Sequence, residues 1–341
     1  MQSERNFYRL CPKYNYIPST LSSKHRIVVY GDLHGDYGLT KKLLEFSKVA
    51  IFDDNDKPMW IGGDTHIVQV GDQIDRCRPL SQNDNCNNDP NLTYHDENSD
   101  VLIMELFNEL HKQAILVGGA VISLLGNHEL MNAMGIMDYV SYKGANDYYS
   151  DDLKKSGLRS RIHDFKPGNI IANMMACTRL AAIIIGSNLF IHGGIIDSTI
   201  TKLNINNRQD LDKLNKLIRE WLLGLIKRKE IDKYLESDIS PFWTRVLGQM
   251  KSNKDYDKEC SINLTNSLKL LKINNIIVGH TPQNIMDDNL INATCNNIVW
   301  RVDTSLSKAF TPIHNKFNKT KPPLQYLQIL EDTQFEVISQ N

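Results

Sequence analysis

The sequence lacks any uninterrupted apolar stretch as long as a membrane span. Residues 1–21 carry charges and prolines in place of the apolar core of a signal peptide. The longest apolar candidate, residues 180–191, is broken by Gly186, Ser187 and Asn188, which favours a two-strand hairpin there. These absences argue against a membrane partner. We expect a soluble, cytoplasmic protein, in the cytoplasm of a host if the chain is viral.

An excess of charge of one sign is also lacking, since 39 basic and 40 acidic residues give a formal net charge of −1. No long-range field then favours nucleic acid, and we expect no nucleic-acid partner. The six cysteines include no CxxC pair, which argues against a structural zinc site. Without a signal peptide, we expect them to be free thiols in a reducing compartment.

The sequence does contain, five times, a short apolar run that stops at a potential metal ligand. In four of the five a glycine stands between the run and the ligand. Each run has the length and branched residues typical of a buried strand. Because ligands bind at the carboxyl ends of strands in open α/β sheets, the five ends predict one shared site. The residues at these ends are Asp32, Asp72, Asn127, His192 and His280.

The chain is long enough, at 341 residues with 41% hydrophobic content, to bury a full core. Strand patterns dominate both ends, helical patterns fill the middle, and potential ligands come from both halves. We therefore predict a leader over residues 1–24 and one catalytic domain over residues 25–341. Residues 77–99 are polar and aperiodic, which predicts an insertion that borders the site. Helical spacing is found at residues 37–49, 101–116 and 210–227, and a terminal hairpin turns at residues 331–334.

The residue types at the strand ends favour two divalent metal ions. Asp32 and His34, two residues apart, can reach one cation, and the Asp72 carboxylate can bridge two. A set of oxygen and nitrogen donors without thiolate suits Mn²⁺, which we expect first, with Fe or Zn as alternatives. The predicted ligands are Asp32, His34, Asp72, Asn127, His192 and His280.

Two such cations activate a bridging water, so the nucleophile is hydroxide and no covalent intermediate is required. His128, next to Asn127, is placed to protonate the leaving oxygen, and Asp75 to orient that imidazole. Phosphate oxygens that do not touch metal call for permanently charged planar donors. Arg76 is the first candidate for that role and Arg245 the second.

Together these motifs, GDLHG, GDQIDR, GNHE, HG and GH, resemble those of the calcineurin-like metallophosphoesterases, in the phosphoprotein phosphatase branch. The segments WIGGDT, LGNHELMN, VGHTPQ and WRVD look like those of the Shewanella-like protein phosphatases. The resemblance runs from about residue 26 to residue 307. It implies an α/β fold, a two-sheet mixed β-sandwich flanked by helices, and hydrolysis of phosphoserine, phosphothreonine or phosphotyrosine on proteins. It also implies the ligands and roles given above, with Asp72 shared between the metals.

Two departures from the family pattern concern the loop after the second strand. Cys77 stands where the family usually has glycine, and the Asn-rich insertion behind it is unlike the compact family loop. Both bear on substrate choice and leave the metal set intact. We expect a phosphoprotein or phosphopeptide substrate, and the oligomeric state stays open.

Two other functions compete with a protein phosphatase. The same metal core serves phosphodiesterases and dinucleoside polyphosphate hydrolases. A non-catalytic scaffold is the second competing function. Such a protein usually loses a ligand or the acid, and all of these residues are present here.

Five further residues have structural interpretations. Asp64 and His66 mimic the first motif but precede their strand, so we expect them to be structural. Glu129 fits a supporting hydrogen-bond role. Arg301 and Asp303 form a buried ion pair or assist the site; we favour the structural role.

Overall fold

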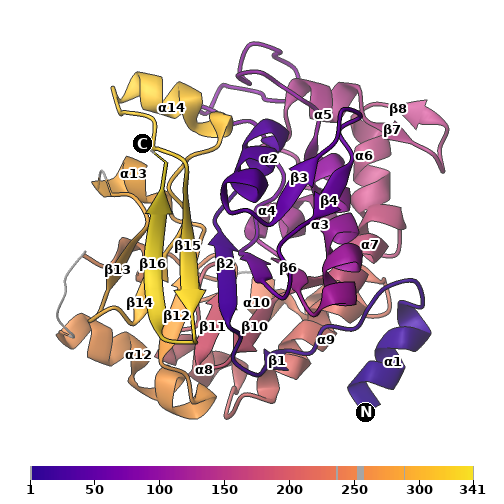
Figure 1. Cartoon of the computed structure of the whole chain (residues 1–341). Coiled ribbons are helices and arrows are strands. Elements are labelled where there is room, and N and C mark those ends of the chain that lie inside the picture. Colours follow the sequence, from indigo (N-terminus) through magenta and orange to yellow (C-terminus); the bar gives the residue numbers. More distant parts are fainter. Residues whose placement is uncertain (1, 236, 252–256, 288, 341) are drawn as a thin grey trace.

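The computed structural model describes residues 2–235, 237–251, 257–287 and 289–340 (Figure 1). Its strands are β1 (Thr20–Leu21), β2 (Arg26–Tyr30), β3 (Ala50–Phe52), β4 (Pro58–Trp60), β5 (His66–Gln69), β6 (Ala120–Leu124), β7 (Tyr149–Ser150), β8 (Lys155–Ser156), β9 (Arg179–Leu180), β10 (Ala182–Ile185), β11 (Asn188–Ile191), β12 (Asn275–Val278), β13 (Asn292–Thr294), β14 (Val299–Arg301), β15 (Gln325–Leu330) and β16 (Gln334–Ser339).

The α-helices are α1 (Gln2–Leu10), α2 (Tyr37–Phe46), α3 (Asp100–Ala114), α4 (Asn127–Ala133), α5 (Tyr142–Asn146), α6 (Leu158–Phe165), α7 (Ile170–Thr178), α8 (Asp197–Leu203), α9 (Asp210–Leu222), α10 (Asp232–Leu235), α11 (Val246–Gln249), α12 (Lys258–Leu271), α13 (Gln283–Asp287) and α14 (Thr311–Lys316). Short 3₁₀ turns cover Ile115–Val117, Arg228–Glu230 and Lys308–Phe310.

Two six-stranded mixed sheets form the centre of the molecule (Figure 1). The first sheet has the order β16-β15-β2-β5-β6-β9, and the second has the order β1-β10-β11-β12-β14-β13. In the first sheet β2, β5 and β6 run parallel, and in the second β11 and β12 run parallel. Parallel neighbours end at the same edge of their sheet, so the predicted ligands that follow these strands are brought together.

The alternation of side chains along β2 explains how it is buried on both faces. Ile27 and Val29 join a core that also holds Phe190 of the second sheet, which places this core between the sheets. Val28 and Tyr30 face the other way and pack with the apolar residues of α2 and α3. The first sheet is therefore covered by the second sheet on one side and by helices on the other.

The outer face of the second sheet is covered in the same way. Ile184 of β10 and Leu189 of β11 belong to a core that includes Leu214 of α9 and Leu264 of α12. The order of layers is thus helix, sheet, sheet, helix. The predicted α/β fold, a two-sheet mixed β-sandwich flanked by helices, is confirmed.

Most element predictions hold, and two helices are shorter than their patterns suggest. Helix α2 ends at Phe46, before the predicted end at residue 49. The hairpin predicted within residues 180–191 forms from β10 and β11, and the terminal hairpin from β15 and β16. Helix α9 ends at Leu222, and Gly224 follows with a φ of 71°, which the backbone of glycine adopts easily. Leu225 therefore lies outside the helix and is exposed, whereas the pattern placed it on the buried face.

The insertion over residues 77–99 contains no helix or strand, as predicted, and it is held to the body of the protein. Asn87 donates from Nδ2 to the carbonyl oxygens of Met137, at 3.0 Å, and Val140, at 2.8 Å. A disulfide joins Cys77 to Cys86 at its start.

The prediction of free thiols is wrong, because all six cysteines form disulfides. The pairs are Cys11–Cys177, Cys77–Cys86 and Cys260–Cys295, with sequence separations of 166, 9 and 35 residues. Only the tertiary fold brings these partners together, so the spacing in the sequence gave no sign of them. The expectation of a reducing compartment rested on free thiols and loses its support.

The N-terminal segment packs on the two-sheet body of the molecule. Strand β1 pairs in parallel with β10, and Phe7 of α1 is buried beside Cys11 and Cys177. Among the described helices, none combines the length and the apolar composition that crossing a bilayer requires.

Candidate metal centre

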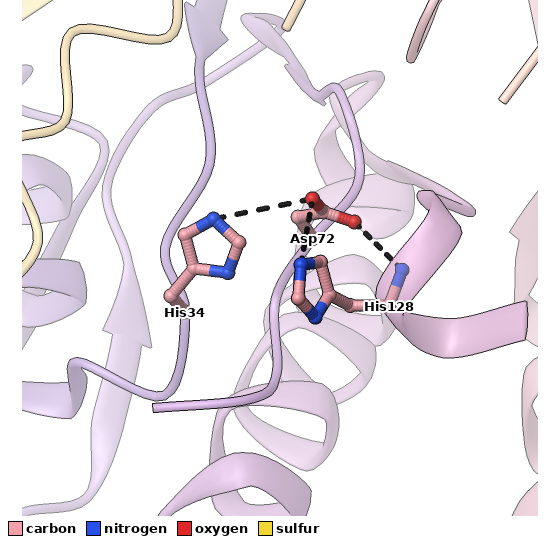
Figure 2. Close-up of side chains that lie close together, drawn as sticks. All are labelled: His34, Asp72 and His128. Carbon is pink, nitrogen blue, oxygen red and sulfur yellow. Dashed lines mark hydrogen bonds and ion pairs between the residues drawn. The ribbon is translucent and has the colours of Figure 1, made fainter. Parts of the chain in front are cut away.

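Side chains from separate strand ends meet around Asp72 (Figure 2). Asp72 Oδ2 lies 3.9 Å from His34 Nε2 and 3.3 Å from His192 Nε2. Asp32 Oδ2 lies 3.8 Å from the same His34 nitrogen. All four side chains are buried. One half of the predicted ligand set therefore gathers as the strand topology requires.

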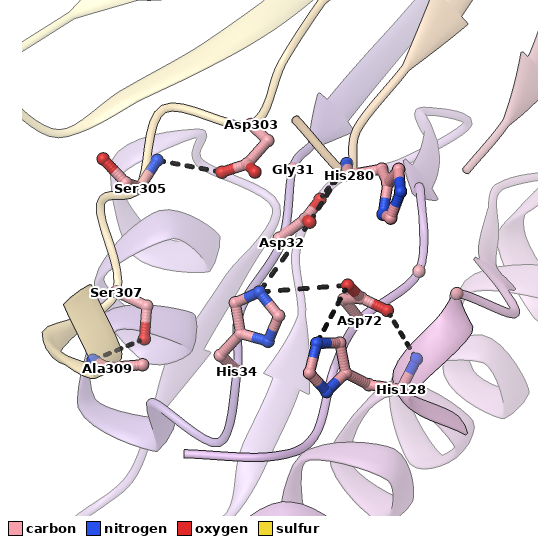
Figure 3. A network of polar contacts seen from close by, with 12 residues as sticks. Gly31, Asp32, His34, Asp72, His128, His280, Asp303, Ser305, Ser307 and Ala309 are labelled. Atoms are coloured by element: carbon pink, nitrogen blue, oxygen red, sulfur yellow. Dashed lines mark hydrogen bonds and ion pairs between the residues drawn. The ribbon is translucent and has the colours of Figure 1, made fainter. Parts of the chain in front are cut away.

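The other half meets at His192. Its Nε2 lies 3.0 Å from Asn127 Oδ1 and 3.2 Å from His280 Nδ1. The backbone N–H of His280 donates to the Asp32 carboxylate, at 3.1 Å from Oδ2, which links the two halves (Figure 3). The structure thus brings together all six predicted metal ligands.

The glycines before the ligands are explained by close packing at the strand ends. A Cβ on Gly126 would stand 2.1 Å from Asp72 Oδ1, and one on Gly279 would stand 2.3 Å from Asp32 Oδ1. Any larger residue would push a ligand carboxylate out of place. The recurrence of glycine beside the ligands is therefore a packing requirement of the site.

The backbone itself is in an uncommon conformation at several site residues. His34, Asp72, Asp75 and His280 have φ angles of 45°, 54°, 71° and 66°. Non-glycine residues rarely adopt positive φ, at a cost of about 1–3 kcal/mol each. Such strain persists only where the surrounding fold holds it, and here it turns each side chain toward the common centre.

The donor chemistry of the centre fits cations. His34 Nδ1 faces the carbonyl oxygen of Ile74 at 3.1 Å, and His192 Nδ1 faces that of Val70 at 2.9 Å. A carbonyl only accepts, so each Nδ1 carries the ring proton and each Nε2 presents a lone pair. These lone pairs face the oxygens of Asp72 and Asn127, which also only accept. Divalent cations between them would satisfy both sides, so the residues fit a divalent metal site.

The charges of the centre support the same conclusion. Burial would raise the pKa of Asp72, but His192, His128 and His34 hold it well below its usual value. Burial lowers the pKa of His34 and of His280 well below the usual value. An ionised carboxylate and neutral imidazoles are the protonation states that metal binding needs, and Asp72, His34 and His280 have them. Burial lowers the pKa of His192, but the Asp72 carboxylate raises it above its usual value, a shift that a bound cation would reverse. Burial, together with Asp303 and Asp72, raises the pKa of Asp32, a repulsion that bound cations would offset.

His128 and Asp75 form a hydrogen-bonded pair beside the ligands. His128 Nδ1 lies 2.8 Å from Asp75 Oδ2. On the other side of the ring, His128 Nε2 lies 3.8 Å from Asp72 Oδ2 (Figure 2). The backbone N–H of His128 donates to Asp72 Oδ1 at 3.0 Å. Asp75 thus fixes one ring nitrogen, and the other faces Asp72 among the predicted ligands.

Three residues that the sequence analysis missed hold Asp75 in place. Asn132 Nδ2 donates to both Asp75 oxygens, at 2.9 and 3.0 Å, and Arg161 Nε donates to Asn132 Oδ1 at 2.9 Å. Arg161 Nη2 in turn donates to Asp100 Oδ2 at 2.7 Å. Asn132 lies four residues after His128 on α4, a spacing that could have revealed it. Nothing in the sequence marks Arg161 or Asp100.

Glu129 has the supporting role that was expected. Its carboxylate accepts from the backbone N–H groups of Asp72 at 3.0 Å, Gln73 at 2.8 Å and Gly126 at 2.7 Å. It therefore ties the end of β5 to the start of α4.

The two predicted phosphate-binding arginines lie at different places. Arg76 is buried, with Nη1 donating to the Gly35 carbonyl at 2.9 Å and lying 3.5 Å from Asp36 Oδ2. Arg245 is exposed, and its Nη1 donates to the carbonyl oxygen of His280 at 2.6 Å. Arg245 thus borders the ligand set, and both roles stay predictions.

Asp303 lies at the site, and the alternative of an ion pair with Arg301 is wrong. Arg301 bonds to the Asn292 side chain and to the Met250 carbonyl. Asp303 accepts from the backbone N–H of Ser305 at 2.9 Å, and its Oδ2 is buried with no hydrogen-bond partner among the described residues (Figure 3). Burial raises the pKa of Asp303 to about 6, and the Asp72 charge adds to the effect.

The motif mimic at the start of β5 is structural in its contacts. His66 Nδ1 lies 3.0 Å from the Asp64 carbonyl oxygen, and His66 pairs with Ile27 and Ala120 at the amino ends of their strands. The metal ligands follow the carboxyl ends.

Comparison with protein families decides the relationship of the chain. The family model for calcineurin-like phosphoesterases matches residues 25–284. This chain belongs to that family. Membership in the calcineurin-like phosphoesterases fits the metal-binding donor set and supports a hydrolase of phosphate esters.

Three similar proteins illustrate the relationship. An uncharacterized protein of Acanthamoeba polyphaga mimivirus is 37% identical over 253 residues, 69% of this chain and 98% of that protein. Shewanella-like protein phosphatase 2 of Arabidopsis thaliana is 26% identical over 319 residues, 83% of this chain and 72% of the relative. A solved cold-active protein tyrosine phosphatase has a TM-score of 0.64 at 22% identity, covering 96% of this chain and 82% of that one, which supports the fold.

Proposed function

We propose that this chain is a dinuclear metal-dependent phosphatase that hydrolyses phosphomonoesters on proteins. The observation that supports this most is the His128–Asp75 pair, whose free ring nitrogen faces the six-ligand cluster. Phosphatases among the relatives favour a phosphoprotein or phosphopeptide substrate over the phosphodiester and dinucleoside alternatives. The presence of every ligand and of the acid weighs against a non-catalytic scaffold.

In the proposed mechanism, different residues of the centre hold the metals and transfer the proton. Asp32, His34 and Asp72 would hold one cation, and Asp72 with Asn127, His192 and His280 would hold the other. When bound, the cations acidify a water molecule and neutralise charge on the phosphate ester. A water oxygen would form the new bond to phosphorus as the ester P–O bond breaks, so that no covalent phosphoenzyme forms. His128 gives the proton on Nε2 to the leaving oxygen, while Asp75 stabilises its ring orientation.

A substrate panel tests the proposal. The purified protein, loaded with Mn²⁺, would be assayed on phosphoserine, phosphothreonine and phosphotyrosine peptides and on diadenosine tetraphosphate. We expect kcat/KM to be higher for a phosphopeptide by an order of magnitude or more. A preference of that size for diadenosine tetraphosphate would favour the alternative, and no hydrolysis of any ester at full metal content would favour a scaffold.

Three further features remain proposals. Mn²⁺ is the first choice of metal, with Fe or Zn as alternatives, and metal analysis of the purified protein tests this. Residues 25–341 are proposed as one catalytic domain preceded by a leader. A cytoplasmic location is a prediction that three disulfides do not favour.

A further inference from the structure

Arg78 lies beside the metal ligands, although no motif pointed to it. Its side chain is buried, and its Nη1 donates to the carbonyl oxygens of Asp75 at 3.0 Å and Cys77 at 2.7 Å. Both carbonyls belong to the loop that follows β5. One end of the guanidinium group is therefore fixed by the backbone that also positions Asp75.

Two aromatic rings fix the rest of the guanidinium group. Its Cζ lies 5.5 Å from the ring centroid of Tyr139 and 4.9 Å from that of Phe310. The Tyr139 ring packs 4.9 Å from the ring of His128, and the Phe310 ring packs 5.4 Å from that of His34. Arg78 is thus held next to the proposed acid on one side and next to a metal ligand on the other.

The positive charge of Arg78 interacts with several titratable groups of the centre. The charges of Asp72, Asp75 and Asp303 act on its guanidinium, while burial lowers its pKa. In turn, after burial, the charge of Arg78 contributes most to lowering the pKa of His34. Among the described residues, however, no carboxylate lies within 4 Å of it in an ion pair. A buried cation without a close counter-ion favours an anionic ligand.

The free donors of Arg78 have the geometry that phosphate binding uses. Its Nε and Nη2 donate to no acceptor in the described part of the chain. These two nitrogens form one edge of the guanidinium plane, with parallel N–H groups that match two oxygens of a phosphate.

The guanidinium group of Arg76, unlike that of Arg78, has most of its donors bonded to the protein and its charge paired with carboxylates. Its Nη1 and Nη2 donate to three backbone carbonyls, those of Gly35, Tyr94 and His95. Its charge is balanced by the carboxylates of Asp36, at 3.5 Å, and Glu97, at 3.9 Å. Arg76 therefore ties the insertion to the loop after β2, and only its Nε lacks an acceptor among the described residues.

We propose that Arg78, in place of Arg76, is the arginine that binds the phosphate group of the substrate through its Nε and Nη2 edge. The inference rests on the proposed function, because it names the residue that holds the phosphoryl oxygens not in contact with metal. Tyr139 and Phe310 act as positioning residues for this guanidinium.

Binding of inorganic phosphate to the Mn²⁺-loaded protein, measured by calorimetry, tests the proposal without relying on turnover. We expect Arg78→Ala to raise the Kd for phosphate about 10- to 100-fold, at unchanged metal content. Arg78→Lys keeps the charge but loses the two-pronged edge, so it should recover only part of the affinity. Arg159→Lys, at an exposed arginine on α6, is the matched control and should bind as the wild type does.

Arg76→Lys is the competing variant. It should lower the melting temperature and raise the Kd for phosphate less than the Arg78 variants do. A Kd within twofold of wild type in both Arg78 variants, or a larger loss in Arg76→Lys, would overturn the proposal. If the Arg78 variants do not fold, phosphate protection of the wild-type protein from phenylglyoxal, mapped by mass spectrometry, replaces them. Protection of Arg78 supports the proposal, and protection of Arg76 without Arg78 contradicts it.

The two proposals fail in different ways. If the wild-type protein binds phosphate through Arg78 but hydrolyses no phosphomonoester, the proposed function is wrong and the anion site stands. If it hydrolyses phosphopeptides while Arg78→Ala binds phosphate normally, only the Arg78 assignment is wrong. A metal-loaded wild type that binds no phosphate contradicts the Arg78 proposal.

Discussion

At the scale of single residues, the centre depends on one carboxylate and one imidazole with different tasks. Asp72 faces His34, His128 and His192 within 4 Å and is therefore the natural shared ligand. His128 forms a hydrogen bond to Asp75. None of the six predicted metal ligands has a side-chain hydrogen bond to Asp75. Binding of metal and transfer of the proton can consequently be separated by mutation.

His128→Ala should leave both metals bound and reduce kcat about 10²- to 10⁴-fold, the usual contribution of a positioned acid. The loss should be largest for an alkyl phosphate, whose leaving oxygen needs a proton, and smaller for para-nitrophenyl phosphate. Steady-state kinetics on both esters, with metal content measured in parallel, check this. Equal turnover of wild type and variant on the alkyl ester would remove His128 from the mechanism.

Asp72→Asn should release metal and activity together, because a neutral amide is a poor bridge between two cations. Elemental analysis of the dialysed protein should find less than half of the wild-type metal content, and kcat should fall at least 10³-fold. Full metal content in a folded Asp72→Asn protein would contradict the shared-ligand role.

At the scale of elements, the strand-to-helix junction between β6 and α4 combines a predicted ligand, the proposed acid and the glycine that lets Asp72 approach. Gly126 stands directly before Asn127 and His128, and the Asp72 carboxylate occupies the space a side chain there would need. The tolerance of this junction to a methyl group is therefore a direct test of the packing.

Gly126→Ala should displace Asp72, lower the free energy of unfolding by about 1–3 kcal/mol, and reduce kcat about 10²-fold. Gly38→Ala on α2 is the matched control, because a Cβ there meets its nearest atom, Lys308 Nζ, at 3.5 Å. Kinetics and urea unfolding of both variants provide the comparison. Wild-type kinetics in Gly126→Ala would show that the junction can relax.

The contact of α3 with β6 predicts a dependence of stability on pH. His111 Nδ1 accepts the backbone N–H of Val121 at 3.2 Å, and burial lowers the pKa of His111 to about 4. In the unfolded chain the pKa is about 6.5, so between pH 6.5 and 4 only the unfolded state takes up this proton. The stability that depends on neutral His111 is therefore complete above pH 6.5 and is lost as pH falls toward 4.

Replacing His111 with glutamine, which cannot titrate, should remove this contribution. The drop in the free energy of unfolding between pH 7 and pH 5 should be about 1–2 kcal/mol smaller in His111→Gln than in the wild type. Urea unfolding at both pH values measures it. An identical drop in the two proteins would contradict the neutral state of the partly buried His111 ring.

At the scale of the whole molecule, two sheets and three disulfides fix segments that are distant in sequence. The Cys11–Cys177 bond joins the N-terminal segment to the end of α7 across 166 residues, whereas Cys77–Cys86 spans 9 residues. A cross-link over a longer loop removes more conformational freedom from the unfolded chain.

The double variant Cys11→Ala/Cys177→Ala should therefore lose about 2–4 kcal/mol of unfolding free energy, and Cys77→Ala/Cys86→Ala should lose less. Urea titration of both variants beside the wild type provides the comparison. Thiol counting in denaturant should find no free thiol before reduction and six after it. Reactive thiols in the unreduced protein would show that the pairs do not form.

The sequence by itself indicated the strands that end at the predicted ligands, and it proposed six metal ligands; through its motifs it also indicated the family and hence the fold class. Short continuous apolar runs rich in branched residues are typical of buried strands, and a glycine with a potential ligand at the carboxyl end of such a run is a local pattern. His128 and Asp75 were proposed as acid and partner in the same way, from their places in those motifs. These features depend on neighbours in the chain, so the order of residues was enough to reveal them.

Only the tertiary structure decided the disulfide pairs, the support of Asp75 by Asn132, Arg161 and Asp100, and the environments of Arg76 and Arg78. Each depends on contacts between residues far apart in sequence, or on which way a loop turns a side chain. Arg76 and Arg78 are separated by one residue, and the sequence does not show that their surroundings differ. The fold surrounds one with carbonyls and carboxylates and leaves the other with an open pair of donors beside the metal ligands.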